Sequence, residues 1–128
     1  MIVAGIGSKR GVGLEEVLAA FDAALARAKL RRDDVSLLAT PAVKGGEAGI
    51  SEAAAKLGLP LVLVPQTQLE SASNRAQTRS ARVVALLRVP SAAETAALAA
   101  AGGQSRLLGP RLALGPVTCA LARREEEA

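Results

Sequence analysis

The sequence contains no histidine, tyrosine or tryptophan, and only one phenylalanine and one cysteine in 128 residues. Without histidine, the chain cannot build a His-based catalytic triad, a His-ligated metal site or a haem with a histidine ligand. The lone Cys119 excludes an intramolecular disulfide and a CxxC motif, and we expect it to be a buried, inert thiol. Because Phe21 is the only aromatic residue, a stacking platform for nucleic-acid bases is excluded as well. We therefore expect no metal and no cofactor.

The charged residues favour an anionic ligand. The formal net charge is +4 and the isoelectric point is near 10.0. Twelve of the 16 basic residues are arginine, whose guanidinium binds carboxylate or phosphate in bidentate fashion. Composition alone leaves nucleic acid, acidic lipid and a polyanionic small molecule open. The bases at 75, 79 and 82 have helix-face spacing, which favours a solvated face over a nucleic-acid patch, so we expect no nucleic-acid partner.

The apolar runs are too short for a membrane span, and no signal peptide is visible. We therefore expect a cytoplasmic protein that does not contact the membrane.

Hydrophobic patterning predicts alternating strands and helices. Strands are predicted at 1–6, 35–40, 59–64, 106–108 and 117–122. Helices are predicted at 14–29, 48–57, 79–87 and 91–101, the last opened by a Ser91–Glu94 capping box. Residues 66–77 are polar and lack a period, which is typical of a mobile surface loop.

Strands that are apolar throughout indicate a sheet covered on both faces. We expect one three-layer α/β/α domain over residues 1–122, followed by a charged, frayed tail at 123–128. Its sheet is expected to be mostly parallel, with about five strands, and to end in an antiparallel hairpin.

Ligands of such folds bind at the carboxyl ends of the strands, where three loops are expected to meet. The first, residues 5–13, holds four glycines together with Lys9 and Arg10 ahead of a helix, a pattern that suits an anion. The alternative is a plain strand-to-helix turn with two solvated bases. The second loop, residues 40–49, holds Thr40, Lys44 and Glu47; spacing alone favours solvated side chains for the last two. The third, residues 66–77, offers a polar lid.

Six motifs occur in a characteristic order along nearly the whole chain. They are GIGSKRG at 5–11 before a Leu-Glu-Glu helix, LAT at 38–40, Lys44 with Glu47 and Gly49, LGLPL at 57–61, PSAAETAALAAAG at 90–102, and TCALA at 118–122. Together they resemble the small cobalamin-biosynthesis family that comprises stand-alone CobE proteins and the C-terminal domain of CbiG proteins.

The resemblance implies an α/β/α domain that binds a corrinoid precursor, a precorrin-type tetrapyrrole with several carboxylates, and holds or delivers this labile intermediate in the aerobic pathway. It also implies other cobalamin-pathway enzymes as partners. The expected substrate-binding residues are Gly5, Gly7, Ser8, Lys9, Arg10, Gly11 and Thr40. The alternative is an enzyme that hydrolyses a precorrin lactone or releases a two-carbon fragment, as CbiG-type hydrolases do. In that reading Glu47 is the base and Lys44 the electrostatic stabiliser.

Overall fold

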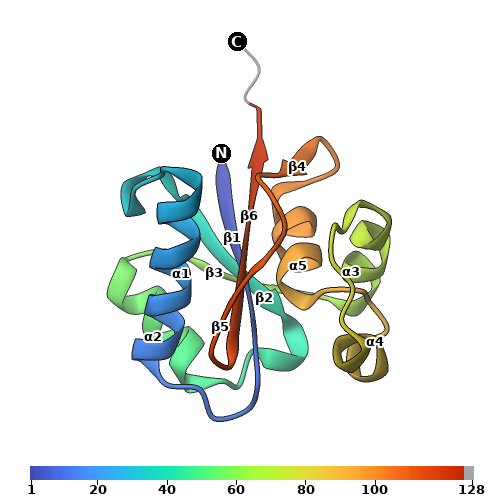
Figure 1. The fold of residues 1–128 in the computed structure, drawn as a ribbon, viewed down its shortest axis with the longest axis horizontal. Helices are drawn as coiled ribbons and strands as arrows, with labels where there is room; N and C mark the ends of the chain where they lie inside the picture. The colour runs from blue at the N-terminus through green and yellow to red at the C-terminus, as the bar shows by residue number, and fades with distance from the viewer. Residues whose placement is uncertain (126–128) are drawn as a thin grey trace.

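A computed structural model describes residues 1–125, which form one six-stranded sheet and five α-helices (Figure 1). In chain order the elements are β1 (Ile2–Ser8), α1 (Leu14–Ala28), β2 (Leu37–Pro41), α2 (Ala48–Leu57), β3 (Leu61–Val64), α3 (Gln66–Ala72), α4 (Ala81–Leu87), α5 (Ala92–Ala101), β4 (Ser105–Leu107), β5 (Leu112–Leu114) and β6 (Val117–Arg124). Single 3-10 turns occupy Arg32–Asp34, Ala42–Lys44 and Ser73–Arg75.

The sheet is mixed, and the expectation of a mostly parallel sheet is not confirmed. The strand order is β3-β2-β1-β6-β4, with β5 also paired to β6. Two of the five strand pairings are parallel, β1 with β2 and β2 with β3. The other three join β6 to its neighbours and are antiparallel. The predicted antiparallel pairing near the end of the chain is confirmed, since β4 and β5 both pair antiparallel with β6. The short turn at 115–116 returns the chain from β5 directly into β6, and a turn this tight allows only an antiparallel neighbour. The sheet is less parallel than expected because β6 also pairs with β1 in the antiparallel direction.

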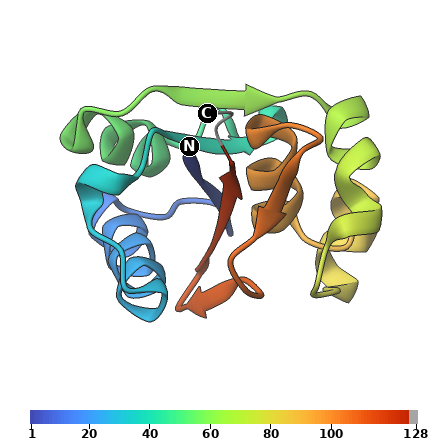
Figure 2. The same cartoon turned by 90° about the horizontal axis from the view of Figure 1, so that it is seen from above.

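Helices cover both faces of the sheet, which gives the three layers predicted from the apolar strands (Figure 2). The core on one face is built around Phe21 of α1 and Ile50 of α2. The core on the other face is built largely from the alanines of α5, with Leu69 of α3. These small side chains let α5 approach β1 closely. A Cβ at Gly5 would lie only 2.7 Å from the backbone nitrogen of Ala97.

Two predicted loops contain regular structure. Residues 66–72 form α3 instead of a mobile loop, because Leu69 and Ala72 are buried on one side of a helix that begins after Pro65. Residues 109–116 contain β5, a three-residue strand that pairs with β6 in register Ala113 to Thr118. Neither element has enough buried positions to produce a period in the sequence.

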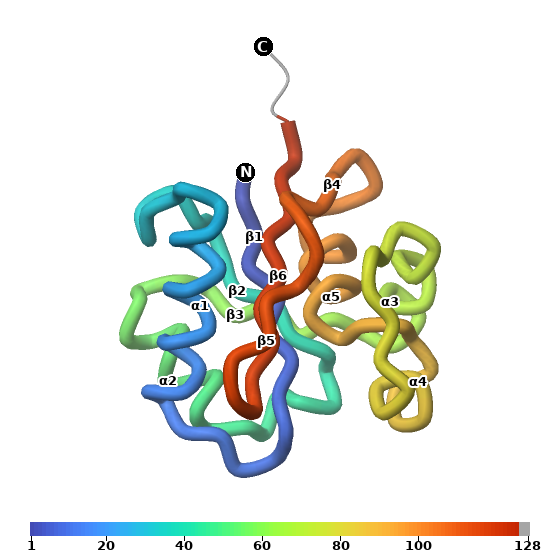
Figure 3. The backbone as a smooth tube through the Cα atoms, in the orientation of Figure 1, coloured from blue at the N-terminus to red at the C-terminus, as the bar shows by residue number. Residues whose placement is uncertain are grey.

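The first and last strands are longer than predicted. The first strand runs on to Ser8, two residues beyond its expected end. The strand β6 continues through Arg123 and Arg124, which the sequence predicts to lie in a frayed tail, and this part of β6 lies beside the start of β1 (Figure 3). The reason is backbone pairing, since Arg124 N donates a 2.9 Å hydrogen bond to Met1 O. Glu125 follows the strand, and residues 126–128 of the predicted tail lie outside the described residues.

The strongly periodic helices are confirmed. Helix α1 ends one residue before its predicted end, and α2 has the predicted bounds, with Gly58 as a left-handed cap at φ +68°. Helix α5 begins after Ser91, whose Oγ accepts a hydrogen bond from Glu94 N at 3.2 Å. The carboxylate of Glu94, however, does not return to the start of its own helix and bonds two other segments instead.

Candidate functional site

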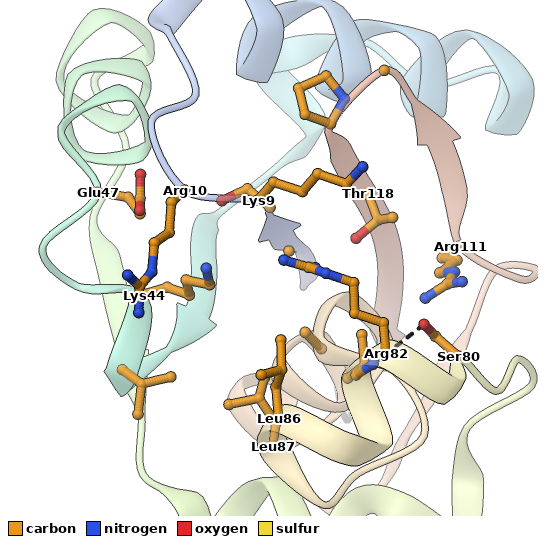
Figure 4. Close-up of a pocket in the computed structure, with 17 residues that line it drawn as sticks. Lys9, Arg10, Lys44, Glu47, Ser80, Arg82, Leu86, Leu87, Arg111 and Thr118 are labelled. Carbon is orange, nitrogen blue, oxygen red and sulfur yellow. Dashed lines mark hydrogen bonds between the residues drawn. The ribbon is translucent and has the colours of Figure 1, made fainter.

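A cavity of about 670 Å³ lies at the edge of the sheet where β1 and β2 end (Figure 4). Four segments border it: 7–10 at the end of β1 and just beyond it, 43–47 after β2, 80–92 around α4, and 111–118 around β5 and the start of β6. The lining residues are Gly7, Ser8, Lys9, Arg10, Val43, Lys44, Glu47, Ser80, Arg82, Val83, Leu86, Leu87, Ala92, Arg111, Gly115, Pro116 and Thr118. The place agrees with the rule that such folds bind ligands at the carboxyl ends of parallel strands.

The end of β1 and the loop that follows it supply four of the predicted binding residues, at positions 7 to 10. Its course is fixed by Lys9 N, which donates a 3.0 Å hydrogen bond to Pro116 O. Gly7 has no room for a side chain, since a Cβ there would lie 2.7 Å from Thr118 Oγ1. The side chains of Lys9 and Arg10 are exposed at the cavity. Charge at this loop therefore comes from two flexible side chains.

The backbone amides at the end of this loop already have acceptors. Gly11 N donates to Glu47 Oε2 at 3.0 Å, and Gly13 N donates to Glu16 Oε1 at 3.1 Å. The anticipated cradle of glycine amides is therefore partly filled by the protein's own carboxylates. Gly11 has φ +77°, a backbone conformation that favours glycine, so the turn alone explains why this residue is glycine.

Three of the predicted binding residues, Gly5, Gly11 and Thr40, are not in the cavity wall. Gly5 lies beneath α5, where a Cβ would meet Ala97. Thr40 is completely buried, and its Oγ1 donates a 2.8 Å hydrogen bond to Ile6 O. Gly5 and Thr40 therefore hold β1 against its neighbours, while Gly11 shapes the turn.

Lys44 and Glu47, the two predicted catalytic residues, both line the cavity from the connection between β2 and α2. Lys44 ends a 3-10 turn and is half-buried. Glu47 stands at the N-cap position of α2, and its bond to Gly11 N ties this connection to the loop after β1. The two side chains thus share one wall with Arg10 (Figure 4).

Two cations that line the cavity, Arg82 and Arg111, are not predicted from the sequence. Arg82 projects from α4, although its spacing suggested a solvated face shared with Arg75. Arg75 instead lies in a separate 3-10 turn and donates a 2.8 Å hydrogen bond to Ser105 O. No local pattern marks Arg111, which precedes β5. Their proximity to the glycine loop is a tertiary feature.

The cavity wall carries an excess of positive charge. Its five cationic side chains are Lys9, Arg10, Lys44, Arg82 and Arg111, and Glu47 is its one carboxylate. Within residues 1–125, none of these five side chains forms an ion pair or donates a hydrogen bond to the protein. Unpaired cations gathered around a concavity attract anions by both charge and geometry.

Beside these charges the wall is aliphatic. Val43 is 68% exposed and Leu86 is 63% exposed, and both line the cavity together with Val83 and Leu87. Figure 4 shows Leu86 and Leu87 on α4, below Lys9 and Arg82 in this view. Exposed aliphatic side chains beside cations favour a ligand that has both an apolar surface and negative groups.

One hydroxyl group of the wall is also without a partner. Ser8 Oγ is buried and forms no hydrogen bond within residues 1–125. Leaving a buried hydroxyl without a hydrogen-bond partner costs about 1–3 kcal/mol of desolvation. Cys119 is buried on β6, and its burial raises the pKa of the thiol to about 12 against the opposing charge of Arg27, in agreement with an inert thiol.

Residues 1–125 contain no group of three or more His, Cys, Asp or Glu side chains able to hold a metal ion. In the same range no single helix has the length and apolar composition to cross a membrane. Helices α4 and α5 meet those two criteria only as a pair bent by 61°, and most of α5 is buried in the core.

The comparisons with known proteins agree with one another. Residues 2–122 match the family described as Cobalamin synthesis G C-terminus. Protein CobE of Sinorhizobium sp is 31% identical over 121 residues, which cover 94% of this chain and 79% of that protein.

Two crystal structures share the fold. CobE, a protein from the cobalamin (vitamin B12) biosynthetic pathway, matches with a TM-score of 0.94 at 30% identity, over 100% of this chain and 93% of its own. Cobalamin biosynthesis protein chiG from Agrobacterium tumefaciens matches with a TM-score of 0.78 at 37% identity, over 98% of this chain and 100% of its own. The chain therefore belongs to the cobalamin-biosynthesis family of CobE proteins and CbiG C-terminal domains.

Proposed function

We propose that the cavity binds a corrinoid precursor with several carboxylates and holds this labile intermediate for the next enzyme of the pathway. The observation that carries the proposal is a set of five cations around one concavity that have no partner among residues 1–125. A carboxylate bound to a lysine or arginine forms a charge-assisted hydrogen bond, roughly twice as strong as a neutral one. Because the five cations come from separate segments around the cavity, binding most of them at once favours a ligand with several carboxylates.

The aliphatic part of the wall separates this ligand from other polyanions. A precorrin-type macrocycle has broad apolar faces and carries its acetate and propionate groups at the rim. Leu86 and Val43 can contact such a face while Lys9, Arg10 and Arg82 reach the rim. A single-stranded nucleic acid would need aromatic side chains on which its bases stack, and none of the lining residues is aromatic.

The exposure of the cations supports a role in holding the corrinoid precursor and delivering it to the next enzyme. Lys9, Arg10 and Arg82 are exposed at the mouth of the cavity, so the ligand edge that they contact remains next to solvent. An enzyme that takes over the intermediate can then approach that edge before release. We therefore expect the partners of this protein to be other enzymes of the cobalamin pathway.

Equilibrium titration with two corrins tests the proposal. The first is cobyrinic acid, in which the acetate and propionate groups are free carboxylates; the second is cobinamide, in which they are amides. Both are used in the dicyano form, so that the axial positions of the cobalt are occupied. We expect cobyrinic acid to bind at least about tenfold more tightly, since one charge-assisted bond contributes roughly 1.5–3 kcal/mol. Equal affinities, or no binding of cobyrinic acid, would contradict the proposal.

A second candidate function rests on the position of Lys44 and Glu47 in the same wall. In a lactone hydrolase, Glu47 would take a proton from water and Lys44 would face the oxyanion that forms at the lactone carbonyl. The test is the product mass after incubation with a lactone-bearing precorrin. Conversion that stops in a Lys44→Ala, Glu47→Ala variant supports this activity. Conversion that is unchanged removes these residues from it. Lys56→Ala with Glu52→Ala is the matched control, because both side chains are exposed on α2 outside the cavity.

A further inference from the structure

The carboxylate of Glu94 is completely buried at the start of α5. Its Oε1 accepts hydrogen bonds from Gln77 N at 2.8 Å and Thr78 N at 2.9 Å, and its Oε2 accepts one from Arg111 N at 2.8 Å. In the described part of the chain no basic side chain is paired with it. The charge is held by three backbone dipoles and by the N-terminus of α5, a favourable place for an anion.

The two segments that meet on this carboxylate both supply cations to the cavity. Arg111 is itself a lining residue, and residues 77–78 lead directly into Ser80 and Arg82. Figure 4 shows Arg82, Ser80 and Arg111 on one side of the cavity, opposite Arg10 and Lys44. Glu94 lies behind this side and is not a lining residue.

Helix α4 depends on such anchoring because packing holds it weakly. None of its residues is fully buried, although Val83 and Leu87 are partly buried against the core. Its base is closed by a 2.8 Å hydrogen bond from Ser80 N to Pro90 O. The bonds of Glu94 to Gln77 and Thr78 fix the chain just before that point.

We propose that Glu94 is the positioning residue of the cavity, which sets Arg82 and Arg111 at the spacing that the ligand carboxylates require. The three backbone N–H groups need two acceptor oxygens, placed as far from the backbone of α5 as a glutamate side chain extends. Glutamine offers one acceptor and would place an NH₂ group against Arg111 N, and aspartate is one methylene shorter. The inference rests on the proposed function, since it concerns how the same cavity binds its ligand.

The test compares Glu94→Gln with Ser105→Ala. Ser105 is a matched control because its hydroxyl is also buried against α5, donating to Leu98 O at 3.2 Å, but at the end of the helix away from the cavity. Both variants are expected to unfold at lower urea concentration. Only Glu94→Gln is expected to bind cobyrinic acid more weakly, by about tenfold, the lower end of the loss seen when a supporting partner of a ligand-binding side chain is removed in metal sites. A folded Glu94→Gln protein that binds like the native protein would overturn the inference.

Hydrogen exchange on the native protein tests the same point if the variant does not fold. Bound cobyrinic acid that holds both arginines should slow exchange at the amides of Gln77, Thr78 and Arg111 together, and more than at Ser105. Unchanged exchange at these three amides in the presence of bound ligand would overturn the role of Glu94. Absence of binding by the native protein would instead contradict the proposed function, so the two failures are distinguishable.

Discussion

Replacing Gly5 with alanine is expected to destabilise the fold strongly, although Gly5 stands in the motif that suggests an anion site. The added Cβ would lie 2.7 Å from Ala97 N and 2.9 Å from Ala97 Cβ, and closer still to Ala93 O. Non-bonded carbon atoms are in contact at about 3.5–4.0 Å, so β1 and α5 would have to separate by about 1 Å. Overpacking costs about 1–3 kcal/mol in cores. Because the added Cβ would meet backbone atoms, we expect the free energy of unfolding to fall by about 3 kcal/mol.

Thermal unfolding followed by circular dichroism measures this loss. For a domain of this size, about 3 kcal/mol lowers Tm by about 10 °C. Gly46→Ala is the control, since a Cβ at Gly46 would meet no atom within 4 Å, and its Tm should remain close to native. A Gly5→Ala protein with native Tm would refute the close packing of α5 on β1.

Three further predictions concern single groups. Thr40→Val should lower the free energy of unfolding in urea by about 1 kcal/mol, because the hydrogen bond to Ile6 O is lost. The affinity for cobyrinic acid should stay native. Weaker binding at native stability would place Thr40 in the site. The pKa of Cys119 is raised from 9.0 to about 12, so its thiol favours the folded state fully below pH 9, and this stability is lost as the pH rises toward 12. The urea midpoint should therefore fall more steeply above pH 9 in the native protein than in Cys119→Ala; equal slopes would contradict this. Arg32→Ala should cost less than about 1 kcal/mol, because its bidentate pair with Asp22 is about half exposed; a loss above about 2 kcal/mol in the same assay would show a larger role.

The elements that could be predicted from the sequence are those whose burial pattern is local. Helix α1 buries Val17, Phe21 and Leu25 on one stripe, and this spacing is visible in the sequence. Helix α3 buries two side chains, and β5 exposes Ala113 and Leu114, so neither produces a period. Pairing with β6 makes β5 a strand, which is a tertiary cause.

The candidate site divides in the same way. Residues 7–10 and 43–47 could be expected together, because they lie at or just beyond the carboxyl ends of neighbouring parallel strands, which meet at one edge of the sheet. Arg82 and Arg111 come from segments that are joined to each other through the buried carboxylate of Glu94. The Ser91–Glu94 pattern predicts a helix cap, and it contains no signal that the carboxylate turns toward Arg111.

The most direct test of the central claim, that cavity cations bind ligand carboxylates, is a titration with cobyrinic acid of two variants of equal charge. Arg82→Gln with Arg111→Gln removes two cations of the cavity, and Arg31→Gln with Lys56→Gln removes two exposed cations elsewhere. At about 1.5 kcal/mol or more for each lost charge-assisted bond, the cavity variant should bind at least about 100-fold more weakly. The control should bind within about twofold of native at physiological salt, because distant exposed charges are screened. Equal weakening in the two variants would show that only net charge matters and would contradict the account.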